Sequence, residues 1–261
     1  NDYIETSSGS DVNDATSTPF NYGLVAWYPF DGNASDMSGN GNDGTVNGAT
    51  LGTDRFGEIG KAYSFDGDDW INCGNDSSLQ LTDAVSISAW AFSDNNDFEN
   101  WTGPRWIVGK NRDIYSGYHL VFSNYDHAEG FVRVRPNTDI ERSVCKKISN
   151  FNLNWVHLSF TYNKNQGGAI FYNGRLVEVS PAKGAILSSE YSTNLNIGRM
   201  ETFNLFHFKG SIDDIRIYDR ALSAEEIKLL YRAESPNHFV QSANNLEMIW
   251  LEPGTFTMGS P

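Results

Sequence analysis

The stretch "GSIDDIRIYDRALSAEEIKLLY", residues 210–231, contains the two local patterns that decide the fold. Its first half alternates as a β-strand does, and strict alternation would place Asp213 on one face with two isoleucines. Its second half predicts a helix, because Ser223 is a good N-cap and Glu226, three residues later, completes a capping box. A carboxylate on an apolar strand face is costly without a compensating group, so Asp213 requires a partner.

Composition limits the classes of protein to which the chain can belong. Its 261 residues are 13% aromatic, include 24 glycines and carry a net charge of −14. Aromatic and glycine-rich chains favour strands and turns, and the acidic charge argues against generic nucleic-acid binding, which needs a basic surface. No run of about 20 apolar residues exists, so we expect no insertion into a membrane.

Many short strand-like runs, divided by Gly, Asn and Asp, occupy residues 22–232. "VSISAWAF", residues 85–92, alternates cleanly between two faces, and "FYNGRLVEV" carries Asn173-Gly174 between two strand runs, which is the strongest short-range hairpin signal. The pattern predicts an all-β fold, a two-sheet antiparallel jelly-roll sandwich with one short C-terminal helix.

The two ends differ in composition from this middle part. Residues 1–21 are polar and without period, which predicts a flexible leader or linker, and residues 234–261 begin like a linker and end in a new strand and turn. The predicted sandwich domain therefore covers residues 22–233. Its two cysteines, Cys73 and Cys145, either form a disulfide or remain buried thiols, and the sequence leaves both alternatives open.

Several phrases, in order, resemble one family. "GKAYSFDGDDWINCG" (60–74), "NWVHLSFTYN" (154–163) and "FKGSIDDIRIYDRALSAEEIKLLY" (208–231) are similar to LamG-like domains of bacterial secreted proteins, within the concanavalin A-like lectin/glucanase superfamily. The resemblance implies stacked antiparallel sheets, often a structural calcium ion, and glycan or protein binding as an accessory module of a larger protein. It also implies a secreted or cell-surface location, bacterial extracellular or periplasmic. We expect a monomer.

The last stretch, "LEMIWLEPGTFTMGSP" (246–261), resembles the beginning of a second family, the formylglycine-generating (sulfatase-modifying) enzyme-like domains. The reactive cysteines of that family lie further along than this chain extends, so the resemblance assigns no such activity here. The alternative interpretation is a chance C-terminal strand.

A calcium site is expected at the loop "DGNASDMSGNGNDG", residues 31–44, which is rich in oxygen ligands and in turn-forming residues. In the family the first strand lies near the last, which would bring this loop to Asp213, and calcium would then compensate that carboxylate. The expected metal ligands are Asp31, Asn33, Asn40, Asn42 and Asp213. The alternative is that Asp213 caps loop amides and that the loop is an ordinary Asx-turn loop without metal.

The loop 93–106, "SDNNDFENWTGPRW", is the leading candidate for glycan binding, because exposed aromatic rings beside polar groups are typical of sugar sites. Residues 105–147 carry a net charge of +3, and an arginine pair there would either bind an anionic glycan or belong to a solvated basic face, which is the commoner case. The candidate ligand-binding residues are Trp101, Trp106, Trp70, Asn100, Arg105, Arg133, Arg135, Tyr118 and His119. Trp106 and Trp70 are equally consistent with the core, and His119 with an ordinary sheet histidine.

The enzyme alternative has weaker support in the sequence. A retaining glycosidase needs two carboxylates about 5 Å apart, and no strand with such an acidic pair is found. Tyr, His and Arg residues around 118–135 are the types that polysaccharide lyases of this superfamily use. We therefore expect a secreted, calcium-stabilised carbohydrate-binding or adhesion module and no enzyme, with a hydrolase or lyase on the same fold as the alternative.

Overall fold

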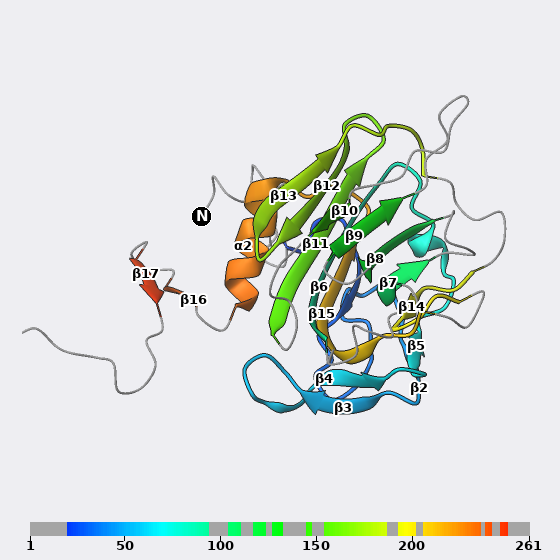
Figure 1. The fold of residues 1–261 in the computed structure, drawn as a ribbon, viewed down its shortest axis with the longest axis vertical. Coiled ribbons are helices and arrows are strands. Elements are labelled where there is room, and N and C mark those ends of the chain that lie inside the picture. The colour runs from blue at the N-terminus through cyan, green and yellow to red at the C-terminus, as the bar shows by residue number, and fades with distance from the viewer. Residues whose placement is uncertain are drawn as a thin grey trace, which may run out of the picture.

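The computed structural model describes residues 20–93, 104–110, 117–123, 127–132, 145–147, 154–186, 193–201, 206–235, 238–241 and 246–249. Two antiparallel sheets stack face to face, which confirms the predicted sandwich (Figure 1). The first sheet has the order β13 (Arg175–Ser180), β12 (Gly167–Tyr172), β11 (Trp155–Asn163), β6 (Ala84–Ser93), β15 (Lys209–Tyr218), β4 (Ile59–Asp66) and β3 (Thr50–Thr53). Strand β1 (Leu24–Tyr28) also pairs with β15, so the first and last strands of the sandwich are neighbours.

The second sheet runs β10 (Cys145–Lys147), β9 (His127–Val132), β8 (Tyr118–Ser123), β7 (Arg105–Lys110), β14 (Asn196–Ile197), β5 (Trp70–Asn72) and β2 (Thr45–Asn47). A short 3-10 helix, η1 (Ser77–Leu79), follows β5. Two further strands, β16 (His238–Gln241) and β17 (Leu246–Ile249), pair only with each other within the described residues. The predicted C-terminal strand is therefore present, whereas the predicted domain boundaries and the second family stay predictions.

The core lies between the two sheets and follows the alternation that the sequence shows. In β6 the side chains of Val85, Ile87 and Ala89 are fully buried in the main apolar cluster. The alternate residues of the strand, Ser86, Ser88 and Trp90, face the other way and are nevertheless buried as well. Both faces of this central strand are therefore covered, one by the second sheet and one by further structure.

A β-bulge in β15 corrects the predicted placement of Asp213. Asp213 pairs with Trp90 and Arg216 pairs with Ser88, so the ladder gains an extra residue between them. Asp214 takes a positive φ of 44°, which is uncommon for a residue with a side chain. The bulge moves Asp213 onto the outer face of the sheet. The prediction that it shares a face with Ile215 and Ile217 was wrong, because simple alternation does not continue through a bulge.

Helix α2 (Ala224–Glu234) covers this outer face, as Figure 1 shows. The predicted capping box is confirmed, with the Ser223 and Glu226 side chains bonded reciprocally to each other's backbone amides. The predicted hairpin turn at Asn173-Gly174 is also confirmed, with both residues at positive φ. A Cβ at Gly174 would come within 2.9 Å of the Tyr231 side chain, so the turn and the helix fit closely together.

Cys73 is a free, buried thiol in the core, so the buried-thiol alternative holds for this residue. Burial raises the pKa of its thiol to about 12, which leaves it protonated and chemically inert at neutral pH. Within the described residues, the structure has no helix with the length and apolar character that a membrane span requires.

Candidate functional site

Asp36, which the sequence analysis did not select, organises the loop 31–44. Its Oδ1 atom accepts hydrogen bonds from the backbone amides of Trp27 and Ser38, both at 2.9 Å, and its Oδ2 atom accepts one from the amide of Asn42 at 2.9 Å. The side chain thus closes the loop on itself and ties it to β1. The pair Asp36 and Ser38, two residues apart, is an Asx-turn signal that could have identified this role.

The five predicted calcium ligands do not form one ligand set. Asn40 and Asn42 both donate through their side-chain amides to the Val25 carbonyl, and Asn33 accepts from the amide of Ser35. Asp31 is exposed and pairs with Lys61 at 3.0 Å.

Asp31 and Asp213 do line one cleft, but each is paired there with a basic side chain that would repel a divalent cation. The predicted set therefore does not fit calcium.

Arg55 supplies the compensation that Asp213 requires. Its guanidinium bridges the two carboxylates at the bulge, bonding to Asp213 and, at 2.7 Å, to Asp214. Its Nε atom donates to the carbonyl of Glu234 at 2.6 Å. One side chain from the β3–β4 loop therefore joins the bulge of β15 to the end of α2.

Glu234, the last residue of α2, is the second buried acid of this cluster. It accepts from Arg216 at 2.8 Å through Oε1 and from the Trp90 indole at 3.1 Å through Oε2. The Nε2 atom of His157 lies 3.7 Å from the same Oε2 atom. The two hydrogen bonds fix the C-terminal end of the helix to β15 and β6, and the neutral His157 of β11 packs beside them.

The cluster formed by Arg55, Arg216, Asp213, Asp214 and Glu234 contains three carboxylates and two guanidinium groups. Burial and the neighbouring Asp214 raise the pKa of Asp213 to about 8, although Arg55 opposes the shift. Burial likewise raises the pKa of Glu234 to about 7. The excess of one negative charge in a buried site thus favours the binding of a proton by these acids near neutral pH.

A cleft of about 460 Å³ opens above this cluster. Its walls come from β1, the β3–β4 loop, the bulge of β15 and the end of α2. Two aromatic rings line it: Arg216 lies 4.1 Å from the centre of the Trp27 ring, and Arg55 lies 4.5 Å from the centre of the Phe56 ring. We refer to it as the helix-end cleft.

A second aromatic site lies at the start of β5, and we name it the Trp70 surface, consisting of Trp70, Arg199 and His207. The Trp70 indole is half-buried, with the Arg199 guanidinium 3.8 Å from a ring centre and the His207 ring 6.4 Å away. The sequence analysis proposed Trp70 for a rim or for the core. The structure places its side chain at the surface, on the outer face of the second sheet.

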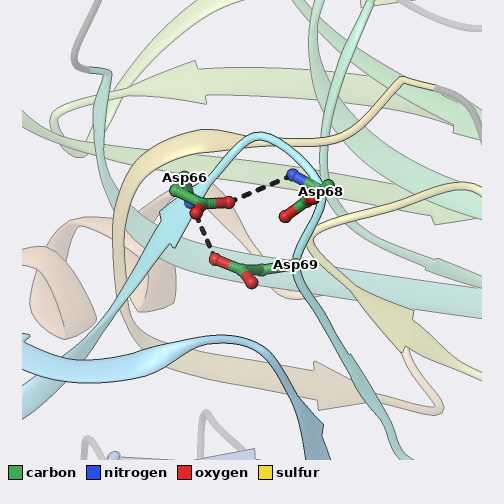
Figure 2. A group of neighbouring side chains, drawn as sticks. All are labelled: Asp66, Asp68 and Asp69. Atoms are coloured by element: carbon green, nitrogen blue, oxygen red, sulfur yellow. Dashed lines mark hydrogen bonds between the residues drawn. The ribbon is translucent and has the colours of Figure 1, made fainter.

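The turn between β4 and β5 adds carboxylates beside the Trp70 surface. Figure 2 shows Asp66, Asp68 and Asp69 gathered about this turn, and their carboxylate oxygens lie within 4.8 Å of one another. Asp69 is buried and accepts from the amide of Asp66 at 2.8 Å. Contact with Asp66 raises the pKa of Asp68, which is exposed to solvent. We name this group the acidic turn.

Three predicted ligand-binding residues are buried instead. Trp106 is 1% exposed, and its ring packs 4.2 Å from that of His119, which is 4% exposed. Burial lowers the pKa of His119 to about 3 and keeps it neutral, so the alternative of a sheet histidine holds. Tyr118 points into the core and donates to the Leu79 carbonyl. The structure therefore does not support these residues as direct ligand contacts.

The remaining candidates are less informative. Arg105 is half-buried at the start of β7. Four others lie outside the described residues, namely Asn100, Trp101, Arg133 and Arg135.

Comparisons with known proteins agree with this architecture. The family model described as the concanavalin A-like lectin/glucanases superfamily matches residues 65–228, more than half of the chain. One curated relative is the human adhesion G-protein coupled receptor D1, 29% identical over 90 residues, which are 34% of this chain and 10% of the receptor. The match thus covers only a small part of that relative.

Solved structures share the fold at low sequence identity. Domain 4 of AbnA, an extracellular GH43 arabinanase from Geobacillus stearothermophilus solved with arabinotriose, has a TM-score of 0.59 and 24% identity, covering 80% of this chain and 98% of that domain. The binding domain of Paraclostridial Mosquitocidal Protein 1 has a TM-score of 0.65 and 17% identity, covering 82% and 53%. The receptor binding domain of botulinum neurotoxin D has a TM-score of 0.63 and 18% identity, covering 84% and 55%.

At these identities, similarity to the solved structures shows only that the fold is shared. The family model, in contrast, matches the amino-acid sequence of this chain. The sandwich, its antiparallel order and the motifs at 60–74 and 208–231 agree with that match. The chain belongs to the concanavalin A-like lectin/glucanases superfamily.

Proposed function

We propose that this chain is a carbohydrate-binding or adhesion module of a larger secreted or cell-surface protein. The observation that carries the proposal is the Trp70 surface, where a half-buried indole lies among an arginine, a histidine and the acidic turn. The arabinotriose complex of the AbnA domain and the binding domains among the similar structures support it by analogy.

The chemistry of the Trp70 surface suits a sugar ring. An indole offers an apolar face that stacks on the C–H groups of a sugar, while nearby carboxylates accept hydrogen bonds from hydroxyl groups. Arg199 lies against Trp70 and restricts its movement, which lowers the entropy lost when a ligand binds. With one stacked ring and few polar contacts, we expect weak binding, in the roughly micromolar-to-millimolar range.

Binding without turnover is the activity that we propose. The two described acids with a strongly raised pKa, Asp213 and Glu234, have the character of a general acid. However, their side chains are 2% and 6% exposed, and each is paired with an arginine. A glycosidase acid must reach the glycosidic oxygen, so these residues are better explained by structure than by catalysis.

A glycan array and calorimetric titration of the hits test the proposal. Trp70→Ala should weaken binding at the Trp70 surface about tenfold, as expected for loss of its stacking ring. Trp155→Ala is the matched control, because Trp155 is also half-buried but lies at the start of β11 in the other sheet. Equal affinity in wild type and Trp70→Ala would move the site elsewhere, and Trp101→Ala would then test the predicted loop.

Turnover has its own measurement. Incubation of polysaccharides with the purified protein should release no new reducing ends and no unsaturated products. Release of either product, at a rate that follows the protein concentration, would replace the binding proposal by the enzyme alternative.

Calcium stabilisation stays a prediction of the family resemblance. Calcium should raise the melting temperature if it binds only the folded protein. Repeating the glycan array with EDTA measures whether glycan binding depends on it. Identical melting curves with calcium and with EDTA would remove calcium from the proposal.

A further inference from the structure

The helix-end cleft has the dimensions of a ligand site and lies apart from the Trp70 surface. Its volume of about 460 Å³ falls within the range of small-molecule pockets, roughly 300–1,000 Å³. The residues lining it belong to the first sheet, the β3–β4 loop and α2, whereas Trp70 lies in the second sheet. It is therefore a separate place on the molecule at which to look for binding.

The floor of the cleft is held together by internal hydrogen bonds and ion pairs. Arg55 is held by Asp213, Asp214 and the Glu234 carbonyl, and Arg216 is held by the Glu234 carboxylate. These groups satisfy one another within the protein, so a ligand has no need to reorganise them. When a ligand binds to such a floor, the protein loses little conformational entropy, which favours even a weak ligand.

The walls carry two aromatic rings. Phe56 is 50% exposed, although a phenylalanine gains most of its stabilisation from burial. The Arg55 guanidinium lies against it, and Arg216 lies against the half-buried Trp27. Each arginine covers part of its ring, and the parts of Phe56 and Trp27 that line the cleft are the surfaces on which a ring-shaped ligand would stack.

The rim offers both hydrogen-bond acceptors and a donor. Asp31 and Lys61 form an exposed pair at 3.0 Å, and Glu58 lies exposed near them. Sugar hydroxyls both donate and accept hydrogen bonds, so a rim of this kind matches them in either direction. Phosphate or carboxylate ligands match it poorly, because six carboxylates line the cleft against three cationic side chains.

We propose that the helix-end cleft is a second glycan-binding subsite, which takes one or two sugar rings without acidic substituents. This inference rests on the proposed carbohydrate-binding function and adds a site to it. Stacking on Phe56 and Trp27 provides the affinity, and the rim provides the hydrogen bonds and rejects acidic sugars.

The test uses the full chain and NMR titration with arabinotriose, cellotriose and chitotriose as neutral probes and trigalacturonic acid as the acidic one. At least one neutral probe should shift the amide signals of Glu58 and Lys61, and trigalacturonic acid should not. In the Trp70→Ala background this binding should persist, and adding Phe56→Ala should weaken it about fivefold, as expected for one lost ring. Ile59→Ala is the matched control, since Ile59 is 87% exposed and adjoins Glu58 but does not line the cleft.

Each result separates the two sites. Complete loss of binding in Trp70→Ala would overturn the cleft and leave the proposed function intact. Unchanged binding in Trp70→Ala together with loss in Phe56→Ala would support the cleft and overturn the Trp70 assignment. Equal affinities in Phe56→Ala and Ile59→Ala would overturn the cleft, as would stronger binding of trigalacturonic acid than of the neutral probes. Binding of no probe by the wild type would overturn both.

Discussion

Two arginine–tryptophan pairs in this molecule have similar geometry and different surroundings. Arg216 lies 4.1 Å from the centre of the Trp27 ring, and Arg199 lies 3.8 Å from a ring centre of Trp70. Arg216 is buried and bonded to Glu234 in a network that joins α2 to the first sheet. Arg199 is half-buried just after β14 of the second sheet, with the Asn196 side chain 3.4 Å from its Nε atom.

The comparison teaches that the same stacked pair serves two purposes according to what surrounds it. In a buried network, removal of one charge leaves its partner uncompensated at high cost. At the surface, water replaces a lost partner, and the pair contributes little to stability. The first pair therefore supports the fold, and the second is better placed to contact a ligand.

The largest expected effect comes from removing the cation of the buried network. Arg55→Met should lower the free energy of unfolding by about 3–5 kcal/mol, because it removes the guanidinium that is bonded to the buried Asp213 and to the half-buried Asp214. Lys61→Met is the matched control, as it breaks only the exposed pair with Asp31 and should leave the free energy of unfolding nearly unchanged. Urea denaturation measures both, and equal effects would contradict the distinction between the two kinds of pair.

The pH dependence of stability tests the network in a different way. The native cluster retains one proton up to about pH 8, whereas unfolded carboxylates lose theirs near pH 4, so stability should fall as the pH rises from 6.5 to 8. The expected loss is about 2 kcal/mol, since one bound proton corresponds to about 1.4 kcal/mol per pH unit.

Buried histidines have the opposite effect at lower pH. Burial lowers the pKa values of His119 and His157 to about 3, so below pH 6.5 the unfolded chain binds protons that the native protein does not. Below pH 6.5 the two histidines therefore oppose the effect of the acids, so the decline of stability with rising pH should be clearest above that pH. Asp213→Asn imitates the protonated acid and should flatten the curve above that pH. An equally steep decline in the variant would place the proton on another group.

The smallest expected effect concerns the surface pair. Arg199→Ala should lower the free energy of unfolding by less than about 1 kcal/mol, the size of an exposed cation–π contact. The same change should weaken glycan binding at the Trp70 surface, because the indole is no longer restricted. A large loss of stability without any change in affinity would show that this pair, like Arg216 and Trp27, supports the fold.

Local patterns predicted much of the fold. The alternation of residues 85–92, the Asn173-Gly174 turn and the Ser223–Glu226 capping box each depend on neighbours within a few positions, and all are present. Strands β2 and β3 were not predicted, because they are only three and four residues long and contain few apolar side chains. Short strands of this kind are stabilised by their partners more than by their own sequence.

The candidate site was harder to predict, because its contacts join distant parts of the chain. Arg55 and Asp213 are 158 positions apart, and no pattern around either residue identifies the other. The bulge at Asp214 could not be predicted from the sequence, because the alternation of polar and apolar residues gives no sign of the extra residue. Trp106 and Trp70 both occur in short strands of the same sheet, yet one is buried and the other half-exposed, owing to packing that lies outside their local sequence.

The position of β15 has a consequence for how this chain acquires its structure. β15 pairs with β6, β4 and β1, so without it the first sheet separates into unconnected pieces. During synthesis from the N-terminus, β1, β4 and β6 therefore emerge long before residues 209–218, the strand that joins them. Pairings over such sequence distances form slowly and leave strand edges open to other chains in the meantime. Aggregation of this protein should accordingly be most acute for nascent or truncated chains that end before residue 218.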